Sequence, residues 1–82
     1  MKLAILVCIW DGEVYDDVVP FIVDTPEGME IAIQAWKDRI KEAYESDSEE
    51  EVLSKIEEGI NNDYCWKDNG GMNSYSLFWG NA

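Results

Sequence analysis

Hydrophobic residues dominate the first ten positions of the chain, where residues 2–10 read KLAILVCIW. A strand with one face in water alternates apolar and polar residues, and this run does not alternate. We therefore expect a strand that is buried on both faces, or one whose second face is covered by a partner. The Asp11-Gly12 pair that follows predicts a two-residue hairpin, because both central positions of a type I′ turn need positive φ.

The segment after this turn, residues 13–23, reads EVYDDVVPFIV and predicts the returning strand of the hairpin. Pro20 lies within it, and proline has no N–H to donate to a neighbouring strand. We therefore expect this strand at a sheet edge, with the first strand nearer to the centre of the sheet.

A helix is predicted over residues 26–45. Thr25 provides a hydroxyl N-cap, Pro26 occupies the first helical position and Glu27 places an acid in the first turn. Apolar residues then recur at steps of three or four, which predicts one core-facing stripe. Its members are Met29, Ile33, Trp36, Ile40 and Tyr44.

A second helix is predicted over roughly residues 49–60. Ser48 and Glu51 have the spacing of a capping box, in which the hydroxyl accepts a bond from the third amide and the glutamate reaches back to the cap. Glu49 and Glu50 fall in the first turn, where the helix dipole favours anions. The expected buried side consists of Val52, Leu53, Ile56 and Ile60.

The last part of the chain predicts a second hairpin, because an Asn-Gly-Gly turn at residues 69–71 separates two aromatic-rich runs, residues 64–67 and 74–79. The order of elements is therefore β-β-α-α-β-β. This order predicts a single α+β domain over residues 1–82, with an antiparallel sheet of three to four strands that carries two helices.

The composition argues against most catalytic chemistry. The chain has no histidine, which removes the Ser-His and Cys-His nucleophiles and the commonest zinc ligand. Cys8 and Cys65 have no zinc-motif spacing, and their apolar neighbours favour buried free thiols, with a disulfide between them as the alternative. Gly70-Gly71 precedes no predicted helix, unlike a phosphate-binding loop. We therefore expect no enzyme activity, no cofactor and no metal ion.

Net charge is the outlying property of this chain, because 18 acidic and 6 basic residues give −12. A hydrophobic fraction of 46% still predicts a folded domain, since disordered acidic tails are poor in apolar residues. A strongly negative surface disfavours nucleic acid and anionic membranes as direct partners and favours basic protein surfaces. No signal peptide or membrane-spanning run is recognised, and we expect a cytoplasmic location in a bacterial host.

The acids gather in two stretches, residues 42–58 and residues 11–30. A helix start needs only about two or three acids near its N-terminus, and neighbouring like charges cost a few tenths of a kcal/mol per pair. Solubility is the plain explanation for the surplus, and contact with Lys or Arg of a protein partner is the sharper one. The candidate contact residues are Glu42, Glu45, Asp47, Glu49, Glu50, Glu57 and Glu58, with Asp11, Glu13, Asp16 and Asp17 as a second patch.

In its size, its lack of histidine, its acid excess and its expected core, the chain resembles the small acidic inhibitors of phages and mobile elements, which include DNA-mimicking anti-CRISPR and anti-restriction proteins. The resemblance covers composition and architecture, without a shared motif. It implies a non-enzymatic inhibitor that occupies a basic nucleic-acid-binding surface of a bacterial defence complex.

Two alternatives to this inhibitor stay open. One is an immunity protein against a basic nuclease toxin, which would need a buried contact on one specific enzyme. The other is an acidic housekeeping homodimer, in which the second face of the strand at residues 2–10 packs against another copy.

Overall fold

Five strands and two helices make up the part of the chain that the computed structural model describes, residues 1–15 and 18–81. The predicted α+β class, with two helices and an antiparallel sheet, is confirmed, and the sheet has more strands than the three to four expected. The elements are β1 (Lys2–Trp10), β2 (Glu13–Val14), β3 (Val19–Ile22), α1 (Pro26–Ala43), α2 (Glu49–Asn61), β4 (Cys65–Lys67) and β5 (Ser74–Asn81).

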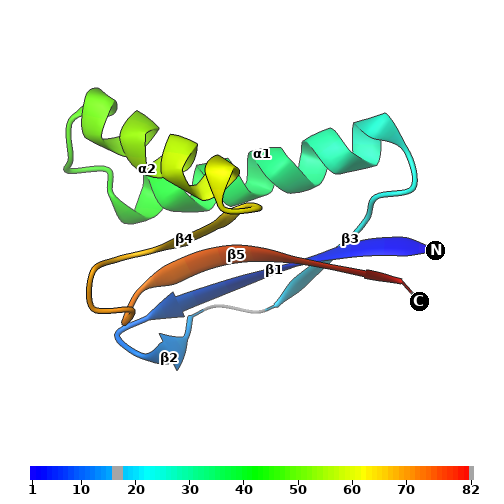
Figure 1. Ribbon diagram of the computed structural model, residues 1–82, viewed down its shortest axis with the longest axis horizontal. Coiled ribbons are helices and arrows are strands. Elements are labelled where there is room, and N and C mark those ends of the chain that lie inside the picture. Colours follow the sequence, from blue (N-terminus) through cyan, green and yellow to red (C-terminus); the bar gives the residue numbers. More distant parts are fainter. Residues whose placement is uncertain (16–17, 82) are drawn as a thin grey trace.

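The sheet is antiparallel, and β1 lies at its centre (Figure 1). On one side β1 pairs with β5 from Lys2↔Asn81 to Ile9↔Ser74, and β4 extends the sheet beyond β5. On the other side β1 pairs with β3 near its start and with β2 near its end. The single returning strand expected over residues 13–23 is therefore two strands along one edge of β1, with Asp16 and Asp17 outside the described residues.

Both predicted hairpins are present, and turn chemistry accounts for the first. Asp11 and Gly12 have φ values of 54° and 81°, as a type I′ turn requires. In the second hairpin β4 pairs antiparallel with β5 through Trp66↔Tyr75. Pro20 lies opposite Ile5 on the edge strand β3, where a missing N–H is tolerated, so its predicted edge position is also confirmed.

Both helices lie on the same side of the sheet (Figure 1). Each begins at its predicted cap: the Thr25 hydroxyl accepts a bond from the Gly28 N–H at 3.1 Å, and the Ser48 hydroxyl accepts one from the Glu51 N–H at 3.2 Å. The Glu51 carboxylate accepts its bond from the Ser48 hydroxyl at 3.2 Å, whereas the capping box predicted the backbone amide of the cap as the donor. The first helix ends earlier than expected, because Tyr44 is its C-cap.

Trp36 lies at the centre of the core between the helices and the sheet. Its side chain is fully buried, and its indole N–H donates to the Tyr75 carbonyl at 2.7 Å. The Tyr64 ring meets it edge-on, with 5.5 Å between the centroids. Such a contact adds about 0.5–1.5 kcal/mol beyond the area that the rings bury.

The buried side of α2 differs from the predicted one. Val52, Ile56 and Gly59 form it, whereas Leu53 and Ile60 are 49% and 39% exposed. The reason is the close approach of Gly59 to the ring of Trp36 on α1, which a side chain at this position would overlap. The prediction for Leu53 and Ile60 is therefore wrong, since the contact with Trp36 sets how α2 is rotated.

Candidate functional site

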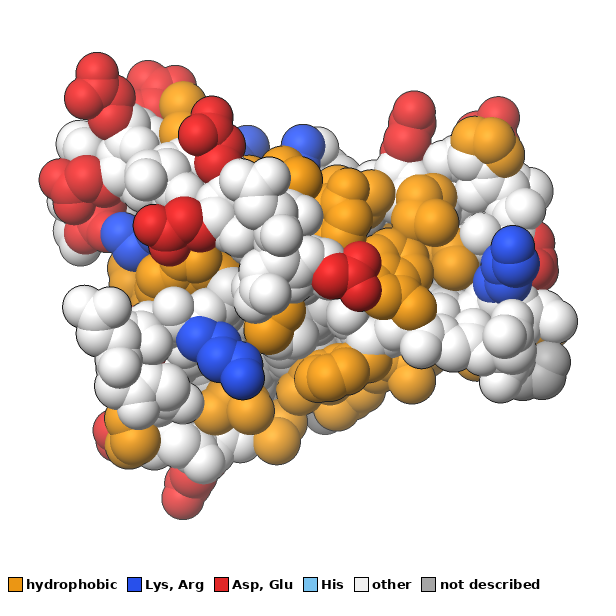
Figure 2. Space-filling model, viewed as in Figure 1, with side chains coloured by type: hydrophobic (Ala, Val, Ile, Leu, Met, Phe, Trp, Pro, Cys, Tyr) orange, Lys and Arg blue, Asp and Glu red, His pale blue; other side chains and the backbone are white. Residues whose placement is uncertain are grey.

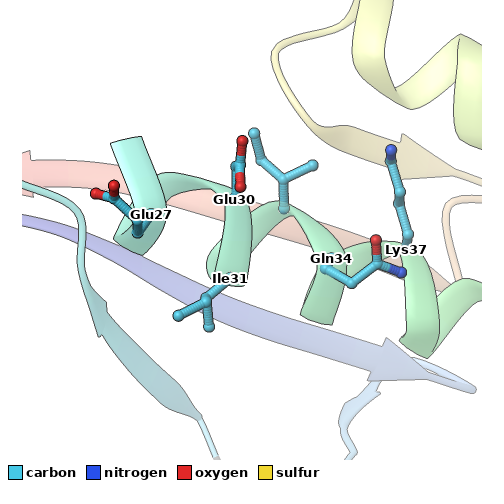
Figure 3. Close-up of a pocket in the computed structure, with 6 residues that line it drawn as sticks. Glu27, Glu30, Ile31, Gln34 and Lys37 are labelled. Atoms are coloured by element: carbon cyan, nitrogen blue, oxygen red, sulfur yellow. The ribbon is translucent and has the colours of Figure 1, made fainter. Parts of the chain in front are cut away.

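The hollows on the described surface are open, and one of about 480 Å³ runs along the outward side of α1. Figure 3 shows Glu27, Glu30, Ile31, Gln34 and Lys37 around it, all projecting from one helix and pointing in different directions. Within residues 1–15 and 18–81 no group of three or more Cys, Asp or Glu is placed to hold a metal ion. The outer surfaces of the domain are therefore the candidates for function.

The helical layer displays most of the first predicted acidic patch. Figure 2 shows acidic side chains gathered at the end of this layer where α2 lies. Glu50 and Glu57 are seven residues apart, so they project from the side of α2 opposite its buried stripe. Five exposed carboxylates have no ion pair with a base among the described residues, and we call them the acidic helical surface: Glu42, Glu45, Glu49, Glu50 and Glu57.

Two other members of the predicted patch have partners inside the chain. Asp47 accepts a bond from the Lys55 ammonium at 2.8 Å, which ties the α1–α2 turn to α2. Glu58 accepts one from the Trp66 indole N–H at 3.1 Å, which ties α2 to β4. These contacts give both acids a structural role. Within the part of the chain that the structure describes, the acids of this predicted patch that have no such partner are the five of the acidic helical surface.

Lys55 is the one base among residues 42–58, and it points inward. Its ammonium lies 4.8 Å from the centre of the Tyr44 ring and 5.9 Å from that of Trp66, within range of cation–π attraction. The hydrogen bond that Lys55 donates to the Asp47 carboxylate raises the pKa of Lys55 above its ordinary value. The base closest in sequence to the exposed carboxylates of α2 is thus held by internal partners.

The second predicted patch does not join the first. Asp11 lies in the β1–β2 turn, where its N–H donates to the Asn73 side-chain oxygen at 2.8 Å. Glu13 is exposed on β2, which packs beside β1 and contacts neither helix. Since Asp16 and Asp17 lie outside the described residues, the structure places only half of this patch, and it places that half on the sheet layer.

The sheet has a second surface, which faces away from the helices and is covered by none of the described helices or strands (Figure 1). Along β1 the even-numbered residues face the helices and are buried from Ala4 to Cys8, whereas the odd-numbered residues from Leu3 to Ile9 face outward and are half-buried. We call these odd-numbered residues, with their ladder partners on β2, β3 and β5, the open sheet face.

Apolar side chains on the neighbouring strands continue this face. Val14, Ile22 and Phe78 lie opposite Ile9, Leu3 and Ile5 respectively. They are among the more exposed apolar side chains described, at 61%, 58% and 57%. The sequence predicted only the β1 part of this face. Phe78 could have indicated the rest, because Ser74, Ser76 and Phe78 alternate along β5 and face the same side. After two serines, a third small polar residue would be expected at position 78.

Neither Cys8 nor Cys65 forms a disulfide, as expected. Cys8 is buried, and the half-buried Cys65 accepts a bond from the Ser76 hydroxyl at 3.0 Å between oxygen and sulfur. Burial also raises the pKa of Tyr75, which is 2% exposed, far above the ordinary value of 10.0. These groups belong to the core and its rim, so the two outer surfaces are what the fold offers to other molecules.

Neither helix has the length and apolar composition needed to cross a membrane. Comparison with known proteins finds no matching family model, no matching curated protein and no matching solved structure. The acidic helical surface and the open sheet face are therefore the features of this chain that point to its function.

Proposed function

We propose that the chain is a non-enzymatic binding protein whose acidic helical surface occupies the basic, nucleic-acid-binding surface of a protein partner. The observation that carries this proposal is the set of five exposed carboxylates at one end of the helical layer, beside a lysine held by internal partners. Carboxylates form strong charge-assisted bonds with Lys and Arg, and their field speeds the encounter with a basic surface. A bacterial defence complex, inhibited by a DNA mimic, is the partner class that this chemistry favours.

The spacing of the carboxylates supports this choice of partner. Glu50 and Glu57 are separated by seven residues of α2, or about 10 Å along the axis at about 1.5 Å per residue. One strand of duplex DNA places about three phosphates in that length, at about 3.4 Å of axis each. A basic groove shaped for a nucleic-acid backbone would therefore meet negative charges over a comparable length.

The experiment that tests the proposal is a tagged pull-down from bacterial lysates at low and high salt, with and without competing duplex DNA. We expect a nucleic-acid-binding complex whose capture falls with salt and with DNA, because both compete for the same basic groups. The Glu50→Gln/Glu57→Gln variant should lose this capture. The control variant, Glu27→Gln/Glu30→Gln, removes the same charge near the start of α1 and should retain it.

Several results would count against the proposal. The proposal fails if neither salt nor duplex DNA reduces the capture of the partner complex. It also fails if both double variants lose this capture equally, because Glu50 and Glu57 would then have no special role. Recovery of a single nuclease that duplex DNA does not displace would favour the immunity protein instead.

A further inference from the structure

The open sheet face has the composition of a buried surface. The outward residues of β1 between Leu3 and Ile9 are all aliphatic, and each is flanked across the ladder by Phe78, another apolar residue, or a small one. In a sheet with one solvated face, the outward positions of a strand are typically polar. Soluble monomers rarely expose a continuous apolar patch of more than a few hundred Å².

Among residues 1–15 and 18–81, the outward positions of β1 and their ladder partners on β2, β3 and β5 carry no charged side chain, which is unusual in so acidic a chain. The chain has 18 acids, yet β1, β3, β4 and β5 contain none. Lys67 on β4 lies opposite Ser74 in the ladder, so one basic residue borders this face at its β4 edge. A partner with an unpaired charge would lose solvation here without gaining a counter-charge, so the face fits an equally uncharged surface.

We infer that this uncharged surface is the open sheet face of a second copy of the chain, and that two copies pack sheet to sheet. Two-fold packing requires a self-complementary patch, and an apolar patch without charges meets this condition. The 26 strand residues each cover roughly 16 Å² at about 3.3 Å by 4.8 Å, which gives about 400 Å² of flat area per copy. Two fully overlapping copies thus cover about 800 Å² of flat area in total, and the side chains that project from the faces must supply the rest of the roughly 1,200 Å² of accessible surface at which specific interfaces begin.

The shape of the open sheet face suits the packing of two copies. Phe78 stands between Ser76 and Gly80, the adjacent positions on the same side of β5, and Ser76 is only 4% exposed. The exposed ring therefore projects beside a low strip of small residues. In a two-fold pair each copy supplies both the projecting ring and the strip, so the ring of one copy has a place over the strip of the other.

The acidic helical surfaces of the two copies do not oppose this arrangement. Facing sheets pack about 10 Å apart, and each helical layer lies roughly another 10 Å outward, so the two acidic helical surfaces are about 30 Å apart. This separation is nearly four Debye lengths at physiological ionic strength, where one Debye length is about 8 Å. The dimer would display its two acidic helical surfaces on opposite outer sides.

The test is the mass of the protein in solution, followed by sedimentation over a wide concentration series. We expect the mass to rise from that of one chain, 9.4 kDa, to twice that value as the concentration increases. Phe78→Glu should hold the protein at the mass of one chain, because it buries a charge at the centre of the interface. Ile31→Glu is the matched control, since Ile31 is equally exposed at 60% but lies on α1, and this variant should dimerise normally.

A second variant separates loss of the interface from loss of the fold. Ile22→Glu changes the other edge of the same face and should also give single chains, while far-ultraviolet circular dichroism of both variants stays that of the wild type. The inference is overturned if the wild-type protein keeps the mass of one chain throughout, or if both variants dimerise as it does. It is also overturned if Ile31→Glu dissociates the dimer, or if the mass rises only with another protein present. None of these outcomes depends on the acidic helical surface, so the proposed function can fail separately.

Discussion

The acidic helical surface and the open sheet face differ in how far their composition departs from that of an ordinary solvent-exposed surface. Outward positions of a surface helix are polar in most soluble domains, so acids on α1 and α2 are compatible with solubility alone. Outward positions of a solvated strand are also expected to be polar, and on β1 they are aliphatic from Leu3 to Ile9. The open sheet face thus departs from the ordinary pattern in kind, whereas the acidic helical surface departs from it only in amount.

This contrast teaches that the more conspicuous feature of the sequence is not the more informative one. A charge of −12 draws attention first, yet some of its acids make internal contacts, such as Asp47 with Lys55 and Glu58 with Trp66. The run of residues 2–10 is less conspicuous, yet neither helix and no described strand covers its outward face.

The largest effect should come from Trp36→Ala, which removes the core that holds the two surfaces together. Trp36 is fully buried and hydrogen-bonded to Tyr75, and such a truncation costs about 3–5 kcal/mol. A domain of this length has roughly 4–12 kcal/mol of stability in total. Urea unfolding should therefore show a partly or wholly unfolded variant, with self-association and partner capture lost together. An unfolding free energy equal to that of the wild type would contradict the central role of Trp36.

A smaller effect is expected from Gly59→Ala, which pushes α2 away from Trp36 and leaves the sheet in place. The added methyl group would overlap the Trp36 ring, and overpacking of this kind costs about 1–3 kcal/mol. Urea unfolding measures the loss, and sedimentation should still detect the dimer. The control is Gly70→Ala in the β4–β5 turn, where the added methyl group lies 3.8 Å from Met72 and should cost little. Equal stability of the two variants would refute the close contact between Gly59 and Trp36.

Ser48→Ala should cost about 1 kcal/mol, because it removes the N-cap of α2 without changing the charge of the acidic helical surface. For a domain of this size the melting temperature should fall by about 4–8 °C. Ser46→Ala, two residues earlier in the α1–α2 turn, is the matched control and should melt with the wild type. If the two variants melt alike, the cap contributes nothing measurable.

Single neutralisations on α2 should change stability by only a few tenths of a kcal/mol, with opposite signs at its two ends. Glu49→Gln removes a favourable charge from the first turn and should lower the free energy of unfolding at low salt. Glu57→Gln relieves repulsion in the second half of the helix and should raise it. Both differences should fade at high salt, and effects of equal sign would contradict the dipole argument.

The ionisation of Tyr44 and Tyr75 should make the free energy of unfolding depend on pH in alkali and leave it unchanged around neutral pH. Burial raises the pKa of Tyr75, and burial followed by the charge of Asp68 raises the pKa of Tyr44, in each case above the ordinary 10.0. The folded state holds these protons more tightly than the unfolded state, so the stability gained is complete below pH 10 and is lost as pH rises above it. Tyr75→Phe should show a smaller alkaline loss in urea unfolding than the wild type, and an identical loss would contradict the assignment.

Much of the fold follows from local patterns in the sequence. The Asp11-Gly12 turn, the Thr25 and Ser48 caps and the edge position of Pro20 all follow from the backbone preferences of single residues. What could not be predicted depends on contacts between distant segments. The rotation of α2 is set by the meeting of Gly59 with Trp36, 23 positions apart in the sequence.

The two candidate surfaces, like the fold, are predictable where they depend on local pattern and unpredictable where they depend on contacts between distant segments. The exposed acids of the helices follow from the helical period, whereas the bond from Trp66 to Glu58 joins a strand to a helix and has no local signal. The run of residues 2–10 predicted two buried faces, or one covered by a partner, and the sequence alone left that choice open. Both helices pack on one side of the sheet, and their placement leaves the face that a partner would cover.

The most direct test of the account is the mass of the wild-type protein at low and high salt, measured by sedimentation beside Phe78→Glu. If the open sheet face joins two copies through apolar contact, the wild type should have twice the mass of one 9.4 kDa chain at both salt concentrations, and the variant should have the mass of one chain. A wild type that stays a single chain, or a dimer that high salt dissociates, would contradict the account.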